Sequence, residues 1–341
     1  MISIIIPCYN AEKLVGKCIE SVLRQTYGDV EVIAVNDCSP DNTIGVLRAY
    51  ADKDPRVKVI DLPKNGDKEA ARYRGLKEAK GDFICFMDND DTLPKDALEV
   101  LLKKQQETDA DIVEGGIARV FDPFGIIRNF APPSELDISQ PELFDEYYIS
   151  FFGINKLSVA VWGKLYRRAL IYDNLDLLKP GGYRFCEDLI FSMRLLPLVK
   201  RYVRIGHCVY NYRWGGTTSK YHPNFYPNQK KCYFAKLDAI KQYNYQKALR
   251  WTKIEMCNVF NTNIQQMVAH HVSYEEMKAF FDGEVQSGFV DSITDGITCR
   301  GAFFPYLKAH DLDGMIAVCK AEMRKGWKRG LLKRMMSMFY K

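Results

Sequence analysis

The sequence predicts an α/β fold with a mostly parallel central sheet, followed by a helical C-terminal region. Three observations support this prediction. Short apolar runs alternate with amphipathic helical patterns over the first 120 residues, as in proteins whose parallel sheet is covered by helices on both faces. Residues 121–225 are less regular and rich in aromatic residues, whereas residues 226–341 return to helical spacing. We therefore expect three regions, 1–120, 121–225 and 226–341.

The expected strands are short, mostly apolar runs. An apolar run without strict alternation is typical of a strand that is buried on both faces. In chain order the runs are Ile2–Ile6, Val30–Val35, Val57–Ile60, Phe83–Met87, Asp111–Val113 and, further along, Cys208–Tyr212.

The expected helices lie between these strands. Their apolar residues recur three and four positions apart, which is the pattern of a helix with one buried face. In chain order the helices are Glu12–Gln25, Asn42–Asp52, Asp67–Lys80, Pro94–Thr108 and an amphipathic helix that begins at Glu187.

The composition is that of an ordinary globular protein of 341 residues, with 47% hydrophobic and 27% charged residues. The formal net charge of +5 is mild, so a nucleic-acid partner is not expected. The ten cysteines include no C-x-x-C pair, which predicts free thiols in a reduced, cytoplasmic protein. The start of the chain lacks the pattern of a signal peptide, and no apolar run reaches the length of a membrane span.

Polar residues gather where three of the expected strands end, at Pro7–Asn10, Asn36–Ser39 and Asp88–Asp91. The carboxyl ends of parallel strands meet at one edge of the sheet, where such proteins bind ligands. The chain has neither a G-x-G-x-x-G motif after its first strand nor a Walker A motif. Asp37 can accept a hydrogen bond from the N–H of a base, although its stretch is also typical of a simple turn.

Asp88, Asp90 and Asp91 directly follow an apolar strand, so their mutual repulsion needs compensation. A hard divalent cation takes carboxylate oxygens as ligands and bridges them to phosphate, which makes Asp88 and Asp90 candidate metal ligands. The structural alternative is a turn before the helix at Pro94, with Asp91 or Thr92 as the N-cap.

Five stretches follow one another between about residues 2 and 215: SIIIPCYNAEKLVGKCIESVLRQTY, EVIAVNDCSPDNT, NGDKEAARYRGLKEAKGDFICFMDNDD, VWGKLYRR and GGYRFCEDLIFSMRL. In residues and order they resemble the family-2 glycosyltransferases with the GT-A fold, of the type that builds bacterial surface polysaccharides. The resemblance implies a Rossmann-like nucleotide-diphospho-sugar transferase domain. It also implies inverting transfer of a sugar, typically from a UDP donor, to a hydroxyl of a glycan or lipid-linked acceptor.

The same resemblance implies roles for individual residues. Region 1–120 would bind the nucleotide sugar, and region 121–225 would form the acceptor side and carry the catalytic base. Asp188 would be the general base, with Glu187 beside it, and Asp90 with Asp88 would hold Mn²⁺ or Mg²⁺. The donor-binding positions would be Pro7, Tyr9, Asp37, Asn65, Arg72, Asp88, Arg213 and Thr218.

Two positions depart from the family's pattern. Tyr73 stands where an asparagine usually follows the arginine, and Cys38 stands where a glycine usually follows the base-binding aspartate. The donor contact usually made by that asparagine is therefore in question at Tyr73. Cys38 would narrow the turn around the base of the donor nucleotide.

Other interpretations of the candidate site stay open. A non-catalytic relative that only binds sugar nucleotides or glycans would need Asp37 and the Asp88–Asp90 pair, whereas the Glu187-Asp188 pair favours an enzyme. Acidic residues in a first helical turn are also favoured by the helix dipole alone. A nucleotidyltransferase would bring a glycine-rich basic loop near the N-terminus, and the sequence has none there.

The C-terminal stretch Met323–Lys341 is basic and aromatic. It predicts peripheral contact with the inner face of the membrane, because basic residues are attracted to anionic lipid. The alternative is a helix packed on the domain or on a second copy of the chain in a homodimer.

Overall fold

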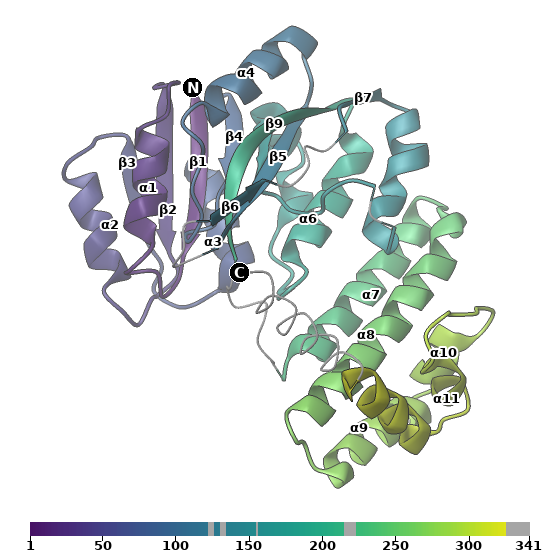
Figure 1. Ribbon diagram of the computed structural model, residues 1–341. Coiled ribbons are helices and arrows are strands. Elements are labelled where there is room, and N and C mark those ends of the chain that lie inside the picture. Colours follow the sequence, from purple (N-terminus) through teal and green to yellow (C-terminus); the bar gives the residue numbers. More distant parts are fainter. Residues whose placement is uncertain (122–125, 130–133, 155, 215–222, 325–341) are drawn as a thin grey trace, which may run out of the picture. The chain divides into compact units, whose positions relative to one another are not determined.

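The computed structural model describes residues 1–121, 126–129, 134–154, 156–214 and 223–324 (Figure 1). The chain divides into two compact units, one made of residues 1–151 and 155–219 and the other of residues 152–154 and 220–341. The strand–helix alternation of the sequence lies in the first unit. The described part of the predicted helical region, residues 226–324, lies in the second unit.

Nine strands from the described residues form one sheet in the first unit. They are β1 (Ile2–Cys8), β2 (Val30–Asn36), β3 (Val57–Asp61), β4 (Phe83–Phe86), β5 (Ile112–Phe121), β6 (Ile126–Asn129), β7 (Leu136–Ser139), β8 (Lys164–Arg167) and β9 (Arg201–Trp214). Their order is β3-β2-β1-β4-β8-β5-β9-β7, with β6 paired to β5. Strands β1 to β4 pair in parallel, whereas β8 runs antiparallel between β4 and β5. Strand β9 is parallel to β5.

Helices pack on both faces of the first strands. They are α1 (Val15–Leu23), α2 (Thr43–Ala51), α3 (Asp67–Glu78) and α4 (Ala97–Thr108). Apolar residues of α1, α2 and α4 share one core with Ile4, Ile6 and Val32. Helix α3 lies on the opposite face, where Gly75 approaches the sheet so closely that a β-carbon would stand 2.6 Å from Ile5. The start of α3 lies at the carboxyl edge of the strands, where Gly66 donates its backbone N–H to Asp37 beyond β2.

Strands β5 and β9 are longer than the runs Asp111–Val113 and Cys208–Tyr212 that the sequence indicates. The sequence underestimates them because each contains a charged residue, Glu114 in β5 and Arg204 in β9, that interrupts its apolar pattern. The two side chains are buried and form an ion pair at 2.9 Å, so they satisfy each other inside the fold. Helix α4 begins at Ala97 and not at Pro94.

The remaining segments of the first unit connect β5 to β9. They include α5 (Arg168–Tyr172), α6 (Glu187–Leu195) and the short helical turns Leu143–Tyr147, Tyr148–Phe152, Leu175–Leu178 and Leu196–Leu198, of which the second ends in the other unit. Helix α6 begins at Glu187, as predicted. It therefore presents both acids of the Glu187-Asp188 pair in its first turn.

The second unit is helical and has its own core, which includes Phe260, Ile264 and Phe281. Its elements are α7 (Phe225–Gln242), the turn Gln246–Ala248, α8 (Leu249–Ala269), α9 (Tyr274–Gln286), α10 (Phe289–Thr294), α11 (Phe304–Lys308) and a further helix over the described residues 312–324. Across the described part of the chain, none of the helices is long and apolar enough to span a membrane. The ten cysteines of the chain all lie in described residues, and none of them forms a disulfide bond there.

Candidate active site

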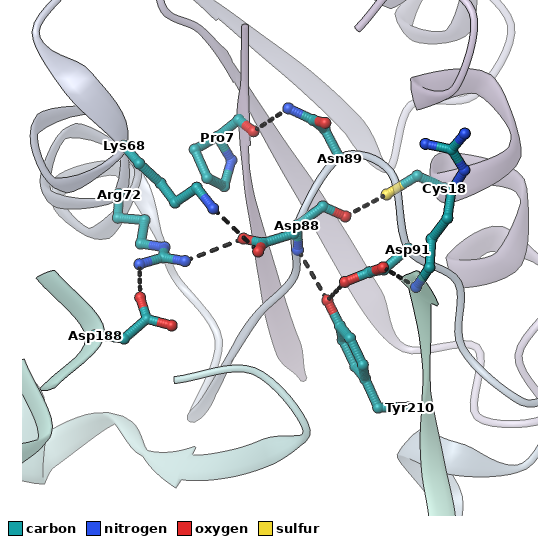
Figure 2. Close-up of polar contacts among 10 residues, drawn as sticks. Pro7, Cys18, Lys68, Arg72, Asp88, Asn89, Asp91, Asp188 and Tyr210 are labelled. Carbon is teal, nitrogen blue, oxygen red and sulfur yellow. Dashed lines mark hydrogen bonds and ion pairs between the residues drawn. The ribbon is translucent and has the colours of Figure 1, made fainter. Parts of the chain in front are cut away.

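Asp88, two residues after β4, lies at the centre of the candidate site (Figure 2). Its carboxylate accepts one hydrogen bond from Lys68 Nζ at 3.0 Å and one from Arg72 at 3.0 Å. Lys68 and Arg72 stand four residues apart on α3, so their side chains share one face of that helix. Burial opposes ionisation of Asp88, but the two cations outweigh it and lower its pKa.

The Arg72 guanidinium also pairs with Asp188, the second residue of α6 (Figure 2). The Arg72 side chain is only 7% exposed, yet the Asp188 and Asp88 carboxylates outweigh this burial and raise its pKa. Burial and the neighbouring Asp188 carboxylate raise the pKa of Glu187. Asp88 and Asp188, which the sequence placed in different roles, thus meet on the buried side chain of Arg72.

Asp91 is buried and does not cap helix α4, whose N-cap is Asp96. It accepts hydrogen bonds from the Tyr210 hydroxyl at 2.7 Å and from the Arg213 backbone N–H at 2.7 Å. The Tyr210 hydroxyl in turn accepts the Asp88 backbone N–H at 3.0 Å. Asp91 therefore fixes the loop after β4 to the end of β9, and the N-cap interpretation is wrong for it. Burial raises its pKa to about 7.

Asp90 is the carboxylate of this group that is open to a metal ion. In the described residues it makes no ion pair or hydrogen bond with another side chain, and burial and the Asp88 charge raise its pKa. No three His, Cys, Asp or Glu side chains converge into a ready metal cage within that same part of the chain. Mg²⁺ and similar ions are commonly held by one or two carboxylates together with substrate phosphates and water. Asp90, with Asp88 beside it, fits such an ion.

Asp37 and Asn65 lie together beyond β2, as the donor-site prediction requires. The Asp37 carboxylate accepts the Gly66 backbone N–H at 2.8 Å, and Asn65 Nδ2 donates to the Asp37 carbonyl at 3.1 Å. Burial raises the pKa of Asp37. Asp41 holds the start of α2, because it accepts the Thr43 backbone N–H at 3.1 Å. Asp41, and not Asp37, therefore accepts the backbone hydrogen bond at the start of α2.

The remaining donor-site predictions fall in three places. The Pro7 carbonyl accepts a hydrogen bond from Asn89 at 3.0 Å (Figure 2). Tyr9, the residue after β1, is 50% exposed. Arg213 is bound to Asp91 through its backbone, and its positive charge acts on Asp90. Thr218 lies outside the described residues.

Three residues of the site were missed by the sequence interpretation: Lys68, Tyr210 and Glu69, whose carboxylate accepts the backbone N–H groups of residues 181–183. The spacing of Lys68 and Arg72 was a usable signal, because residues four apart on a helix face the same way. Tyr210 carried no local signal, since it acts on residues about 120 positions earlier in the chain. Trp162 stacks on Tyr210 with ring centroids 4.6 Å apart, which places it in the scaffold behind the site.

Comparisons with known proteins identify the family of the chain. The family model described as Glycosyl transferase family 2 matches residues 3–174. The uncharacterized glycosyltransferase EpsJ of Bacillus subtilis is 31% identical over 249 residues, which cover 71% of this chain and 70% of EpsJ. The poly(ribitol-phosphate) beta-glucosyltransferase of Bacillus spizizenii is 32% identical over 205 residues, 59% of this chain and 30% of that protein.

A solved structure extends the likeness in fold to the second unit. Residues 1–349 of S. aureus TarS, crystallised in complex with UDP-GlcNAc, match with a TM-score of 0.68 and 21% identity over 95% of this chain and 92% of that one. The family match over half of the chain and the 31% identity to EpsJ show that the chain belongs to glycosyl transferase family 2 and is a glycosyltransferase, and the likeness to TarS shows that it has the GT-A fold.

Proposed function

We propose that this glycosyltransferase inverts the configuration of a sugar while moving it from a UDP-sugar to a hydroxyl of a glycan or lipid-linked acceptor. The observation that carries the proposal is the position of Arg72 between Asp88 and Asp188. It brings the carboxylate expected beside the donor to the carboxylate expected to act as the base. The UDP-GlcNAc complex of TarS, whose fold this chain shares, supports a UDP-sugar as the donor class.

The donor nucleotide would lie along the edge formed by the ends of β1, β2 and β4. The Asp37 carboxylate accepts backbone hydrogen bonds from Gly66 and Asp67, and because each carboxylate oxygen has two lone pairs it can still accept the N–H of a base. Tyr9 is exposed beside this region, and the Pro7 carbonyl is fixed by Asn89. Asn65 holds the backbone of Asp37 in place. These contacts suit a nucleotide whose diphosphate points toward Asp88.

Asp188 would accept the proton of the acceptor hydroxyl while the acceptor oxygen attacks the anomeric carbon. Attack from the face opposite the diphosphate inverts the configuration at that carbon. A positioned general base of this kind typically contributes about 10²–10⁴-fold to the rate. Arg72 orients Asp188 before the reaction, because its guanidinium binds that carboxylate directly.

Negative charge builds up on the nucleotide diphosphate as the sugar departs. Lys68, Arg72 and Arg213 bring positive charge to this region, since all three act electrostatically on Asp88 or Asp90. Asp90 and Asp88 would hold Mn²⁺ or Mg²⁺ there, and the ion when bound supplies Lewis-acid stabilisation of the leaving diphosphate.

A donor panel tests the proposal. UDP release from UDP-glucose, UDP-galactose and UDP-GlcNAc would be measured with Mn²⁺ and with excess chelator, using the wild type, Asp188→Asn and Asp90→Ala. We expect chelator and Asp90→Ala to lower turnover by orders of magnitude and to weaken donor binding. Asp188→Asn should lower turnover about 10²–10⁴-fold while calorimetric donor affinity stays within a few-fold.

Asp176→Asn is the matched control, because Asp176 is an exposed acid that pairs only with Lys179 in the described part of the chain. It should behave as the wild type. Near wild-type turnover by Asp188→Asn would place the base elsewhere, with Glu187 the next candidate. Full activity in excess chelator would exclude the metal assignment.

A further inference from the structure

Glu69, in the first turn of α3, binds the loop that precedes the proposed base. One oxygen of its carboxylate accepts three consecutive backbone N–H groups, from Gly181 at 3.0 Å, Gly182 at 2.8 Å and Tyr183 at 3.2 Å. Three backbone amides that converge on one anion form a concave cradle that favours negative charge. The loop is thus folded around a side chain more than 110 positions earlier in the sequence.

The sequence of the loop is suited to this cradle. A β-carbon on Gly181 would stand 2.3 Å from the Tyr183 ring, so a larger residue there would displace the ring. Gly182 has a φ of +69°, a conformation that residues with a side chain rarely adopt. The glycine pair therefore allows the three amides to point at a single oxygen.

Two further contacts bind the same loop to the same helix. Arg184 donates to Asp67 at 2.6 Å, and Asp188 pairs with Arg72. Asp67, Glu69 and Arg72 all lie within the first six residues of α3. The loop from Gly181 to Asp188 is consequently held along its length by one end of one helix.

That end of α3 is also attached to the donor side of the site. Gly66, immediately before α3, donates its N–H to Asp37, and Lys68 donates to Asp88. A change in the position of the loop relative to α3 would therefore change the distance between Asp188 and the donor. Displacements of about 1 Å at a reacting group can lower a rate about 10²-fold.

We infer that Glu69 is a positioning residue, which sets the place of Asp188 by anchoring residues 181–183 to the donor-binding end of α3. The inference rests on the proposed function, in which Asp188 is the general base. The negative charge of Glu69 matters, because hydrogen bonds from backbone N–H groups to a carboxylate are stronger than those to a neutral oxygen. Glutamine keeps the shape and one acceptor oxygen, so it should preserve part of the anchoring.

The test uses the full-length chain carrying Glu69→Ala or Glu69→Gln. Glu78→Ala is the matched control, because Glu78 lies on the same helix, is exposed and pairs with Arg74. Hydrogen exchange of the amides of residues 181–183 should quicken at least 10-fold in Glu69→Ala, less in Glu69→Gln, and not in Glu78→Ala. In the donor assay, kcat should fall about 10–100-fold in Glu69→Ala. Glu69→Gln should restore part of this loss, and KM for the donor should stay within about threefold.

A double variant separates positioning from general destabilisation. In the Asp188→Asn background there is no base left to position, so Glu69→Ala should lower the residual turnover by less than about threefold. A loss as large as in the wild type, or unchanged exchange of residues 181–183, would overturn the inference and leave the proposed function standing. Near wild-type turnover by Asp188→Asn alone would overturn both.

Discussion

Single carboxylates in the site differ in what they contact, and their chemistry differs accordingly. Asp88 faces two cations and is held ionised. Asp91 is buried, and its hydrogen bonds from a hydroxyl and a backbone N–H do not offset the cost of burying its charge, so its pKa is raised. Asp90 remains open to an added ion. Three neighbouring aspartates thus differ in their surroundings within one loop: Asp88 is paired with cations, Asp91 holds the backbone in place, and Asp90 makes no ion pair or hydrogen bond with another side chain in the described residues.

Asp91 predicts a specific dependence of stability on pH. Its pKa is raised from 3.8 to about 7 in the folded protein. Between pH 4 and 7 the unfolded chain has released this proton and the folded chain still holds it, so the free energy of unfolding should fall as pH rises. The contribution over this window is up to about 4 kcal/mol, and it levels off above pH 7. Asp91→Asn should remove this part of the slope.

Urea unfolding of both proteins between pH 4.5 and 8 measures the effect. Asp52→Asn, which changes an exposed carboxylate at the end of α2, is the control and should keep the wild-type slope. Parallel pH profiles for the wild type and Asp91→Asn would show that Asp91 is ionised in the folded protein throughout.

At the scale of single elements, the turn after β2 offers a way to test the proposed nucleotide pocket by experiment. Cys38 follows Asp37 and has a φ of +54°, the conformation in which glycine is favoured, which accounts for the usual glycine at this position. Cys38 therefore departs from the family pattern in its side chain but adopts the positive φ that suits the usual glycine. Its thiol is exposed, so this turn carries a natural chemical probe beside Asp37.

Cys38 should be protected by the nucleotide. If UDP binds against Asp37, UDP at ten times its Kd should slow alkylation of Cys38 by iodoacetamide about 10-fold, because only the free fraction reacts. Mass spectrometry of the Cys38 peptide measures the rate. Cys299, a partly exposed thiol of the second unit, serves as the internal control and should react at the same rate with and without UDP. If Cys38 is alkylated at the same rate with and without UDP, the uracil of UDP does not bind against Asp37.

For the whole molecule, the basic C-terminal stretch predicts binding to anionic membranes. This stretch lies almost entirely outside the described residues, and its cations are Arg324, Lys325, Lys328, Arg329, Lys333, Arg334 and Lys341. Each basic residue near an anionic surface contributes roughly 1 kcal/mol, so seven are enough to hold a protein there. The full chain should float with vesicles that contain phosphatidylglycerol and be released by salt.

A truncation before Met323 is the comparison, and neutral phosphatidylcholine vesicles are the control. The truncated chain should stay at the bottom of the gradient with both kinds of vesicle. Equal, salt-insensitive behaviour of the two proteins would favour a tail that packs on the protein itself or on a second copy.

The predictable part of the molecule is the part encoded by neighbouring residues. The four parallel strands, the helices between them and the start of α6 at Glu187 follow from local patterns, and the structure confirms them within a few residues. The lengths of β5 and β9 were underestimated, because Glu114 and Arg204 look like exposed residues in the sequence and are seen to be a buried ion pair only once the two strands lie side by side. Glu69 and Tyr210 were missed for a similar reason, since their partners lie more than 110 positions away.

The insertion of β8 between β4 and β5 has a consequence for synthesis of the chain on the ribosome. Strand β4 ends at Phe86, but its antiparallel neighbour does not begin until Lys164. At about 5–20 residues per second, the ribosome needs roughly 4–16 seconds to add the intervening chain. During that interval the nascent polypeptide exposes an unpaired apolar edge, which chaperones recognise and on which chains aggregate. Slow translation or crowded polysomes should therefore affect the yield of this enzyme through β8 before any step of catalysis is involved.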